Sequence, residues 1–192
     1  MKFSRILWIG ILVLSPVSMA WAASLLFKTA AEGDLLLIQR LIAEGGDIEE
    51  VDLMSGFTPL HVAVIRNQKD VVDWLLAEGA NIEARDSRGE TPLHLATNKL
   101  NVPMMNLLLL KGANVNSQSQ MGLTPLHLAV TDGRPESLDV AKILLEKGAD
   151  RDLKDSFGRT PIDWVSDSSL WINRKMYDLL SKWPDNESLS IK

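Results

Sequence analysis

A four-residue motif recurs along this chain at a nearly constant spacing, and this periodicity constrains the fold more than any other feature. The motif Thr-Pro-Leu-His begins at Thr58, Thr91 and Thr124, at intervals of 33 residues, and a variant, Thr-Pro-Ile-Asp, begins at Thr160 after 36 residues. A period between about 20 and 50 residues predicts a stack of similar supersecondary units, because one such unit cannot bury its apolar face alone. We therefore expect a repeat protein.

Each repeated unit reads as a helix, a short turn, a second helix and an extended loop. Threonine is a favourable N-cap residue, and proline fits the next position because its missing N–H would have no helical partner there. The second helix of one unit carries Val71, Val72, Leu75 and Leu76 at helical spacing, and Gly79 follows it where a left-handed residue would end a helix. The same pattern returns in the next two units.

These residues and their spacing resemble the ankyrin repeat, and the resemblance covers residues 25–183. It implies an all-α solenoid of stacked helix-turn-helix units with projecting β-hairpin-like loops. The predicted domain, residues 23–183, divides into an N-terminal cap at 25–56, repeats at 57–89, 90–122 and 123–158, and a C-terminal cap at 159–183, followed by a flexible tail at 184–192. The caps depart from the motif, as expected of terminal repeats that present one polar face to water.

The beginning of the chain predicts a cleaved signal peptide over residues 1–22. A basic start and an apolar run over 6–14 precede Ala20 and Ala22, the small residues that a signal peptidase reads, so cleavage is expected before Ala23. The alternative is an uncleaved anchor, but a membrane-spanning helix needs roughly 20 apolar residues. We expect a periplasmic protein without a stable membrane anchor after cleavage, or alternatively a secreted one.

Composition excludes several classes of function. The chain contains no cysteine, which excludes disulfides, thiolate metal sites and a cysteine nucleophile. Residues 23–192 carry 18 basic and 25 acidic side chains, a formal charge of −7 without a local basic patch. Nucleic acid and anionic membrane surfaces are therefore poor partners.

The candidate catalytic and metal-binding residues are accounted for by the repeat. His61, His94 and His127 are equivalent residues of neighbouring repeats, about one helix-packing distance apart (~10 Å), so they cannot share a metal ion. The resemblance implies that each links the motif threonine to the adjoining loop, whereas Asp163, in the fourth copy, cannot donate such a bond. A calcium site or acid–base pair among the loop carboxylates is the alternative, but their spacing lacks the calcium-loop pattern. We expect no metal, no cofactor and no enzyme.

The loop-tip positions that the repeat leaves variable are the predicted contact surface for a partner protein, together with the adjoining helix ends. Several are apolar, and the alternative is that each packs on its neighbouring loop. The predicted partner-binding residues are Phe57, Ile65, Arg66, Arg88, Glu90, Lys99, Met121, Leu123, Phe157 and Arg159. The longer fourth interval places about three extra residues in 132–139, which are either a tolerated loop insertion or an enlargement of that surface.

The resemblance to small exported bacterial ankyrin-repeat proteins implies a non-catalytic scaffold, monomeric on its own, that supports or neutralises another protein. A periplasmic enzyme such as a catalase and a toxin delivered by a neighbouring cell are the two partner types it brings in. A secreted effector that engages a host protein is the alternative, and an enzyme is a more distant one. The identity of the partner is not written in the chain.

Overall fold

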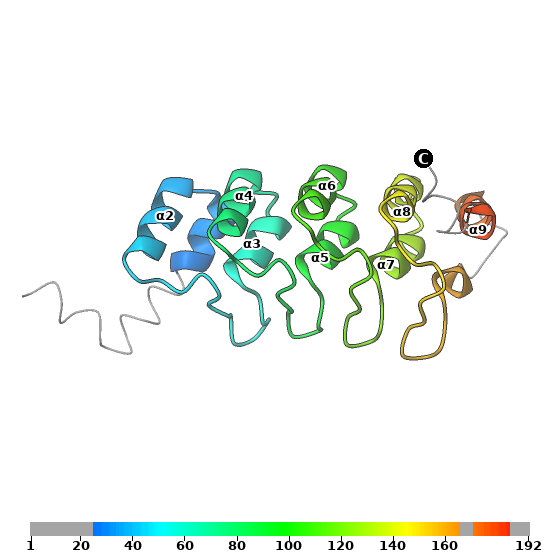
Figure 1. Ribbon diagram of the computed structural model, residues 1–192, viewed down its shortest axis with the longest axis horizontal. Helices are drawn as coiled ribbons and strands as arrows, with labels where there is room; N and C mark the ends of the chain where they lie inside the picture. Colours follow the sequence, from blue (N-terminus) through cyan, green and yellow to red (C-terminus); the bar gives the residue numbers. More distant parts are fainter. Residues whose placement is uncertain (1–24, 166–170, 185–192) are drawn as a thin grey trace, which may run out of the picture. The chain divides into compact units, whose positions relative to one another are not determined.

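The computed structural model describes residues 25–165 and 171–184, and all the regular elements in these residues are helices (Figure 1). They form two compact units, which are treated separately below. The N-terminal unit comprises residues 25–53 and 57–80, and the C-terminal unit comprises 54–56, 81–165 and 171–184. The predicted signal peptide, its cleavage site at Ala22 and Ala23, and most of the predicted tail lie outside the described residues.

The N-terminal unit is built from short helices that pack in pairs. Its helical segments are residues 25–32, α2 (Leu35–Ala43), α3 (Pro59–Ile65) and α4 (Lys69–Ala77). Both α2 and α3 pack against α4, and the side chains of Ile38, Leu60 and Leu75 are fully buried there. Burial of each such side chain contributes about 1.5–3 kcal/mol, so packing rather than helix propensity holds these two-turn helices in place.

The C-terminal unit repeats this pairing and continues it. Its elements are α5 (Pro92–Asn98), α6 (Val102–Leu110), α7 (Pro125–Thr131), α8 (Ser137–Glu146), the 3-10 helix η2 (Pro161–Trp164) and α9 (Trp171–Lys182). Within the unit, α5 packs on α6 and α7, α7 packs on α8 and η2, and α9 packs on α8 and η2. The predicted all-α fold of stacked helix pairs with projecting loops is confirmed.

Histidines of the motif connect one repeat to the next within the C-terminal unit. The Nδ1 atom of His94 accepts from the Thr91 backbone N–H at 3.1 Å, and its Nε2 atom lies 2.9 Å from the Leu123 carbonyl oxygen. Because a carbonyl only accepts, Nε2 carries the proton. His127 makes the same pair of bonds, to Thr124 and to the Arg159 carbonyl. Burial lowers the pKa of both imidazoles, so they stay neutral linkers.

The fourth copy of the motif behaves differently. Asp163 accepts from the Thr160 backbone N–H at 2.8 Å and from its hydroxyl at 2.7 Å, so the cap itself is retained with a carboxylate in place of the imidazole. The segment that follows Thr160 is a single 3-10 turn, η2, rather than the two-turn α-helix of the other copies. An ionised carboxylate has no proton to donate to a further loop, so the link made by His94 and His127 is not repeated.

The extra residues predicted within 132–139 are divided between the connection from α7 to α8 and the start of α8 itself. The connection between α7 and α8 spans residues 132–136, against three residues, 99–101, between α5 and α6. The remaining extra residue lengthens α8, which has 10 residues where α6 has nine. Arg134 donates to Asp132 at 2.6 and 2.7 Å and closes this connection on itself.

Gly112 and Gly122 both have a positive φ, but they differ in the space that is available for a side chain. Gly112 ends α6 with φ +95° and has open space where a Cβ would stand. Gly122 has φ +72°, but a Cβ there would lie 2.7 Å from the Ser156 backbone nitrogen and 3.0 Å from the Asp155 Cα. The first needs glycine only for its backbone conformation, whereas the second needs it also for space.

We expect Gly112→Ala to reduce the free energy of unfolding by about 1–2 kcal/mol, the cost of a left-handed non-glycine residue. Gly122→Ala should cost at least about 1 kcal/mol more, because the added methyl forces two loops apart. Urea denaturation of the two variants measures the difference. Equal losses would contradict the close approach of these loops.

Candidate protein-binding surface

Three loop tips of the C-terminal unit share one backbone conformation. The Gly89 N–H donates to the Asp86 carbonyl at 2.9 Å, and the Asp86 N–H donates to the Glu90 carbonyl at 3.0 Å. The tips at 119–123 and 155–159 are closed by the equivalent bonds, at 2.8 to 3.0 Å. We call these segments the 86–90, 119–123 and 155–159 tips. Each is a tight turn that presents its central side chain outward.

Consecutive tips are joined to one another by backbone hydrogen bonds. The Gln120 N–H donates to the Arg88 carbonyl at 3.0 Å, and the Ser156 N–H donates to the Met121 carbonyl at 2.9 Å. The Ser87 N–H donates in the same way to the Ser55 carbonyl at 2.9 Å. Figure 1 shows the loops that precede α5, α7 and η2 projecting from the same side of the helices. The tips therefore form a row whose spacing is set by main-chain bonds.

Long polar side chains reinforce the row beneath the tips. Arg85 donates to the carbonyl oxygens of Gly89 and Gln118, at 3.0 and 2.6 Å. One repeat later, Gln118 donates to the carbonyls of Gly122 and Lys154, both at 2.9 Å. Each of these side chains therefore hydrogen-bonds both its own loop and the next one.

The turn-opening carboxylates have structural partners. In the last tip, Asp155 Oδ1 accepts from the N–H groups of Phe157 and Arg159 at 2.8 and 2.9 Å, and Oδ2 accepts from the Trp164 indole at 2.9 Å. Burial by itself raises the pKa of Asp155, but these N–H groups and the Arg159 guanidinium lower it to about 2. Asp86 accepts two backbone N–H groups, both at 2.8 Å. These carboxylates hold turns, as expected of aspartate in loops.

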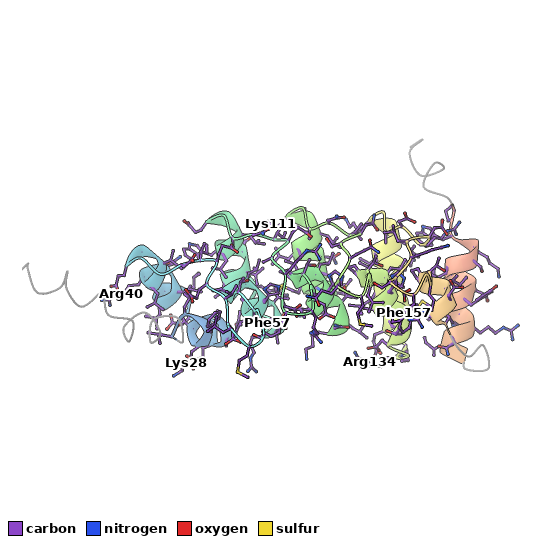
Figure 2. All side chains as sticks on the ribbon, turned by 90° about the horizontal axis from the view of Figure 1, so that it is seen from below. Lys28, Arg40, Phe57, Lys111, Arg134 and Phe157 are labelled. Atoms are coloured by element: carbon purple, nitrogen blue, oxygen red, sulfur yellow. The ribbon has the colours of Figure 1, made fainter. Side chains whose placement is uncertain are left out.

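The residue before each tip glycine faces solvent. Met121 is 50% exposed and Phe157 is 66% exposed, and Arg88 is exposed in the tip that precedes them. Phe157, labelled in Figure 2, packs against the Arg159 guanidinium at 4.9 Å from the ring centroid. The same guanidinium lies 3.8 Å from the centroid of the Trp164 ring. The structure therefore brings Arg88, Met121 and Phe157 onto one row of tips.

The residue after each tip glycine serves the loop instead. Glu90 is only 7% exposed, so the expectation that its side chain is open to a partner is wrong. Its Oε2 atom lies 2.6 Å from an Arg88 guanidinium nitrogen, and burial raises the pKa of its carboxyl. Leu123 is half-buried, and Arg159 is held by Asp155. These three positions supply carbonyls and side chains to the neighbouring tip and leave less surface for a partner.

The other predicted residues lie elsewhere. Phe57, in the N-terminal unit, is half-buried and stacks on His61 with ring centroids 5.7 Å apart. In the same unit, Ile65 is half-buried at the end of α3 and Arg66 is exposed just after it. Lys99 is exposed at the end of α5 in the C-terminal unit.

Sequence reasoning missed two exposed apolar side chains. Leu53 and Met54 are 99% and 92% exposed, in the loop closed by the bond from the Asp52 N–H to the Phe57 carbonyl at 2.9 Å. This loop has one residue more than the 86–90 tip between its closing residues. The signal was present, because two large apolar residues stand side by side in a turn, but they fall in the segment assigned to the N-terminal cap.

Across 25–165 and 171–184, no helix combines the length and the apolar character needed to cross a membrane. In the same residues, no three His, Asp or Glu side chains are grouped in a way that could hold a metal ion.

Comparison with known proteins shows which repeat family these units resemble. A family model described as "Ankyrin repeats (3 copies)" matches residues 26–119 and 99–182. The chain is 38% identical over 63 residues to ankyrin repeat domain-containing protein 40 of Mus musculus, covering 33% of this chain and 17% of that protein. It is 36% identical over 72 residues to ankyrin repeat and SOCS box protein 6 of Mus musculus (38% and 17%) and 36% identical over 66 residues to the 2-5A-dependent ribonuclease of Mus musculus (34% and 9%). The chain thus spans less than a fifth of these relatives.

Replacing Asp155 with asparagine should lower the melting temperature at neutral pH by a few degrees, because an amide cannot accept from the indole and the guanidinium as a carboxylate does. The folded-state pKa of about 2 lies below the usual 3.8, so this carboxylate stabilises the fold above about pH 4 and the contribution is lost as pH falls toward 2. Melting curves between about pH 7 and 2 should therefore show the gap between wild type and variant closing in acid. Asp152→Asn, an exposed position three residues earlier, is the control. A gap that is independent of pH would contradict the assignment.

Proposed function

Because this chain belongs to the ankyrin-repeat family, we propose that it is a non-catalytic protein-binding scaffold whose partner contacts the exposed row of loop tips. The observation that carries the proposal is the alternation at the tip glycines. Arg88, Met121 and Phe157 precede the glycine and face solvent, while the residues that follow it are turned to the loops. Arginine, methionine and aromatic side chains are the types enriched at protein interfaces.

Pre-organisation supports this reading. The exposed side chains stand on backbone that is bonded within each tip and between tips, at 2.8 to 3.0 Å. A partner that binds such a surface does not have to order the loops, so less free energy is lost on association. The Phe157 ring is further held by the Arg159 guanidinium. A rigid aromatic anchor of this kind is typical of residues that dominate binding.

The absence of an enzymatic role is proposed on the same contacts. His94 bonds a backbone N–H and a carbonyl at its two nitrogens, and Asp155 is occupied by backbone, indole and guanidinium donors. Neither side chain is placed to act on a substrate. The ribonuclease among the relatives matches over 9% of its length, so its name describes a protein that is mostly outside the similarity.

We further propose that the scaffold acts in the bacterial periplasm, where it supports a resident enzyme or neutralises a delivered toxin. The support is the sequence of residues 1–22, with its basic start, short apolar run and small residues before Ala23. The second candidate is a secreted effector that binds a host protein, which the same segment allows. Both share the tip row as the contact surface.

We expect Met121→Ala combined with Phe157→Ala to weaken partner binding by at least about 2 kcal/mol, roughly a 30-fold rise in Kd, if these side chains are central anchors. The measurement is recovery of the partner from periplasmic extract on the immobilised protein, with mass-spectrometric identification and a titration of the recovered species. Leu110→Ala with Tyr177→Ala is the matched control, since both are exposed apolar side chains away from the tips. Unchanged recovery by the tip variant would move the contact surface elsewhere, and loss accompanied by a collapsed melting curve would show that the two side chains are structural.

Export should leave a mature chain of residues 23–192. The intact mass of protein recovered from the soluble periplasmic fraction of a Gram-negative host tests this directly. Ala22→Arg is a suitable companion, because a large charged residue at that position blocks the peptidase. A full-length species that remains in the membrane fraction of the unaltered protein would overturn the proposed location.

A further inference from the structure

The backbone row of tips runs in one direction and has an open end. In each pair, the carbonyl of the residue before the tip glycine accepts an N–H from the following loop: Arg88 from Gln120, and Met121 from Ser156. The equivalent carbonyl of the last tip belongs to Phe157. Across the described residues, no N–H donates to it. The last tip thus presents the same acceptor, and no loop within residues 25–165 and 171–184 donates to it.

The space around the tip glycines shows the same difference between the last tip and the earlier ones. A Cβ at Gly89 would lie 2.7 Å from the Gln120 backbone nitrogen, and one at Gly122 would lie 2.7 Å from that of Ser156. Gly158 has nearly the same φ, +78° against +71° and +72°, yet no described atom lies within 4 Å of the place where its Cβ would stand. The space that a neighbouring backbone fills at the earlier tips is open here.

Helix α9, which follows this tip in the chain, has a buried apolar face, and this limits what can bind at the open edge. Ile172, Met176 and Leu180 of α9 are buried, and α9 packs on α8 and η2. The opposite face of α9 carries exposed charged side chains, including Arg174 and Asp178. A second copy that continued the stack would have to bury that charged face, and removing charged side chains from water costs free energy. A thin segment of chain meets no such obstacle.

We propose that the edge formed by the Phe157 carbonyl and Gly158 docks an extended backbone segment of the partner protein, which donates an N–H to that carbonyl. This inference rests on the proposed function and adds the mode of recognition. At three places in this unit, the carbonyl of the residue before a glycine already accepts a main-chain N–H from the next loop, at 2.9 to 3.0 Å. An unpaired backbone edge is a general template for strand addition. The exposed Phe157 ring beside it favours an apolar side chain at the docked position.

The test uses a phage-displayed library of linear 12-residue peptides, selected on the full chain. Gly158→Asn adds a Cβ where the docking backbone would pass, and asparagine tolerates positive φ better than other residues. Gly148→Asn is the matched control, because Gly148 has φ +87°, open space at its Cβ position and a place at the end of α8. Selected peptides are then synthesised, and their affinity is measured against the three proteins after equal melting curves are established.

We expect peptide affinity to fall at least tenfold with Gly158→Asn and to stay within twofold with Gly148→Asn. N-methylation of the peptide at one backbone amide should cost at least tenfold, because it removes the donated N–H, and this arm applies even where Gly158→Asn folds poorly.

Three results would overturn the inference: no selected peptide, equal affinity for the Gly158 variant, or tolerance of N-methylation at every amide. Peptides lost with Met121→Ala and Phe157→Ala but retained by Gly158→Asn would leave the proposed function standing and remove the backbone mode. Self-association that Gly158→Asn abolishes in sedimentation would instead place a second copy on the edge.

Discussion

The close approach of one loop backbone to the next governs the C-terminal unit. A main-chain N–H can reach the carbonyl of the preceding tip only if no Cβ stands between the two strands of chain, and at Gly122 the available distance is 2.7 Å. Glycine is needed there for a second reason, its φ of +72°. The two demands coincide at one residue, so a single side-chain-free position sets the turn, the spacing of the tips and the direction in which their side chains point.

The histidines transmit this spacing to the helices. The imidazole of His94 bonds the start of its own helix with one nitrogen and the next loop with the other. A neutral ring suits this task because it has one donor and one acceptor on opposite sides, and burial keeps it neutral by lowering its pKa. Asp163 keeps the cap but lacks a proton to give, so the chain of links stops at η2. Helix stacking and loop spacing therefore depend on one hydrogen-bonded system.

The same system separates residues that build the surface from residues that are displayed on it. Glu90, Leu123 and Arg159 follow the glycine, and their carbonyls or side chains are used within the loop row. Arg88 and Met121 precede it, and their carbonyls, rather than their side chains, accept the N–H groups that join one tip to the next. Their side chains are therefore released to solvent on a fixed backbone. A surface of this kind can change its chemistry at the displayed positions without altering the fold.

Sequence alone was sufficient for the features that depend on local chemistry repeated at a fixed period. The motif threonines, the glycines after the second helices and the turn-opening aspartates could be assigned because each has a local backbone requirement. The links from His94 and His127 to the adjoining loops followed from the family resemblance. What remained undetermined was exposure. Glu90 is buried although it stands in a loop, and Leu53 and Met54 are exposed although they are apolar.

The sequence also did not show that the connection over 132–136 ends at residue 136. That boundary depends on where α8 begins, and Ser137 and Val140 at its start are buried. Exposure in the loop row depends in part on residues about 30 positions away in the chain, because the Gln120 and Ser156 N–H groups donate to the carbonyls of Arg88 and Met121. The open edge at Phe157 and Gly158 is visible only in the tertiary structure for the same reason. The residues there match the other tips, and only the loop that would cover them differs.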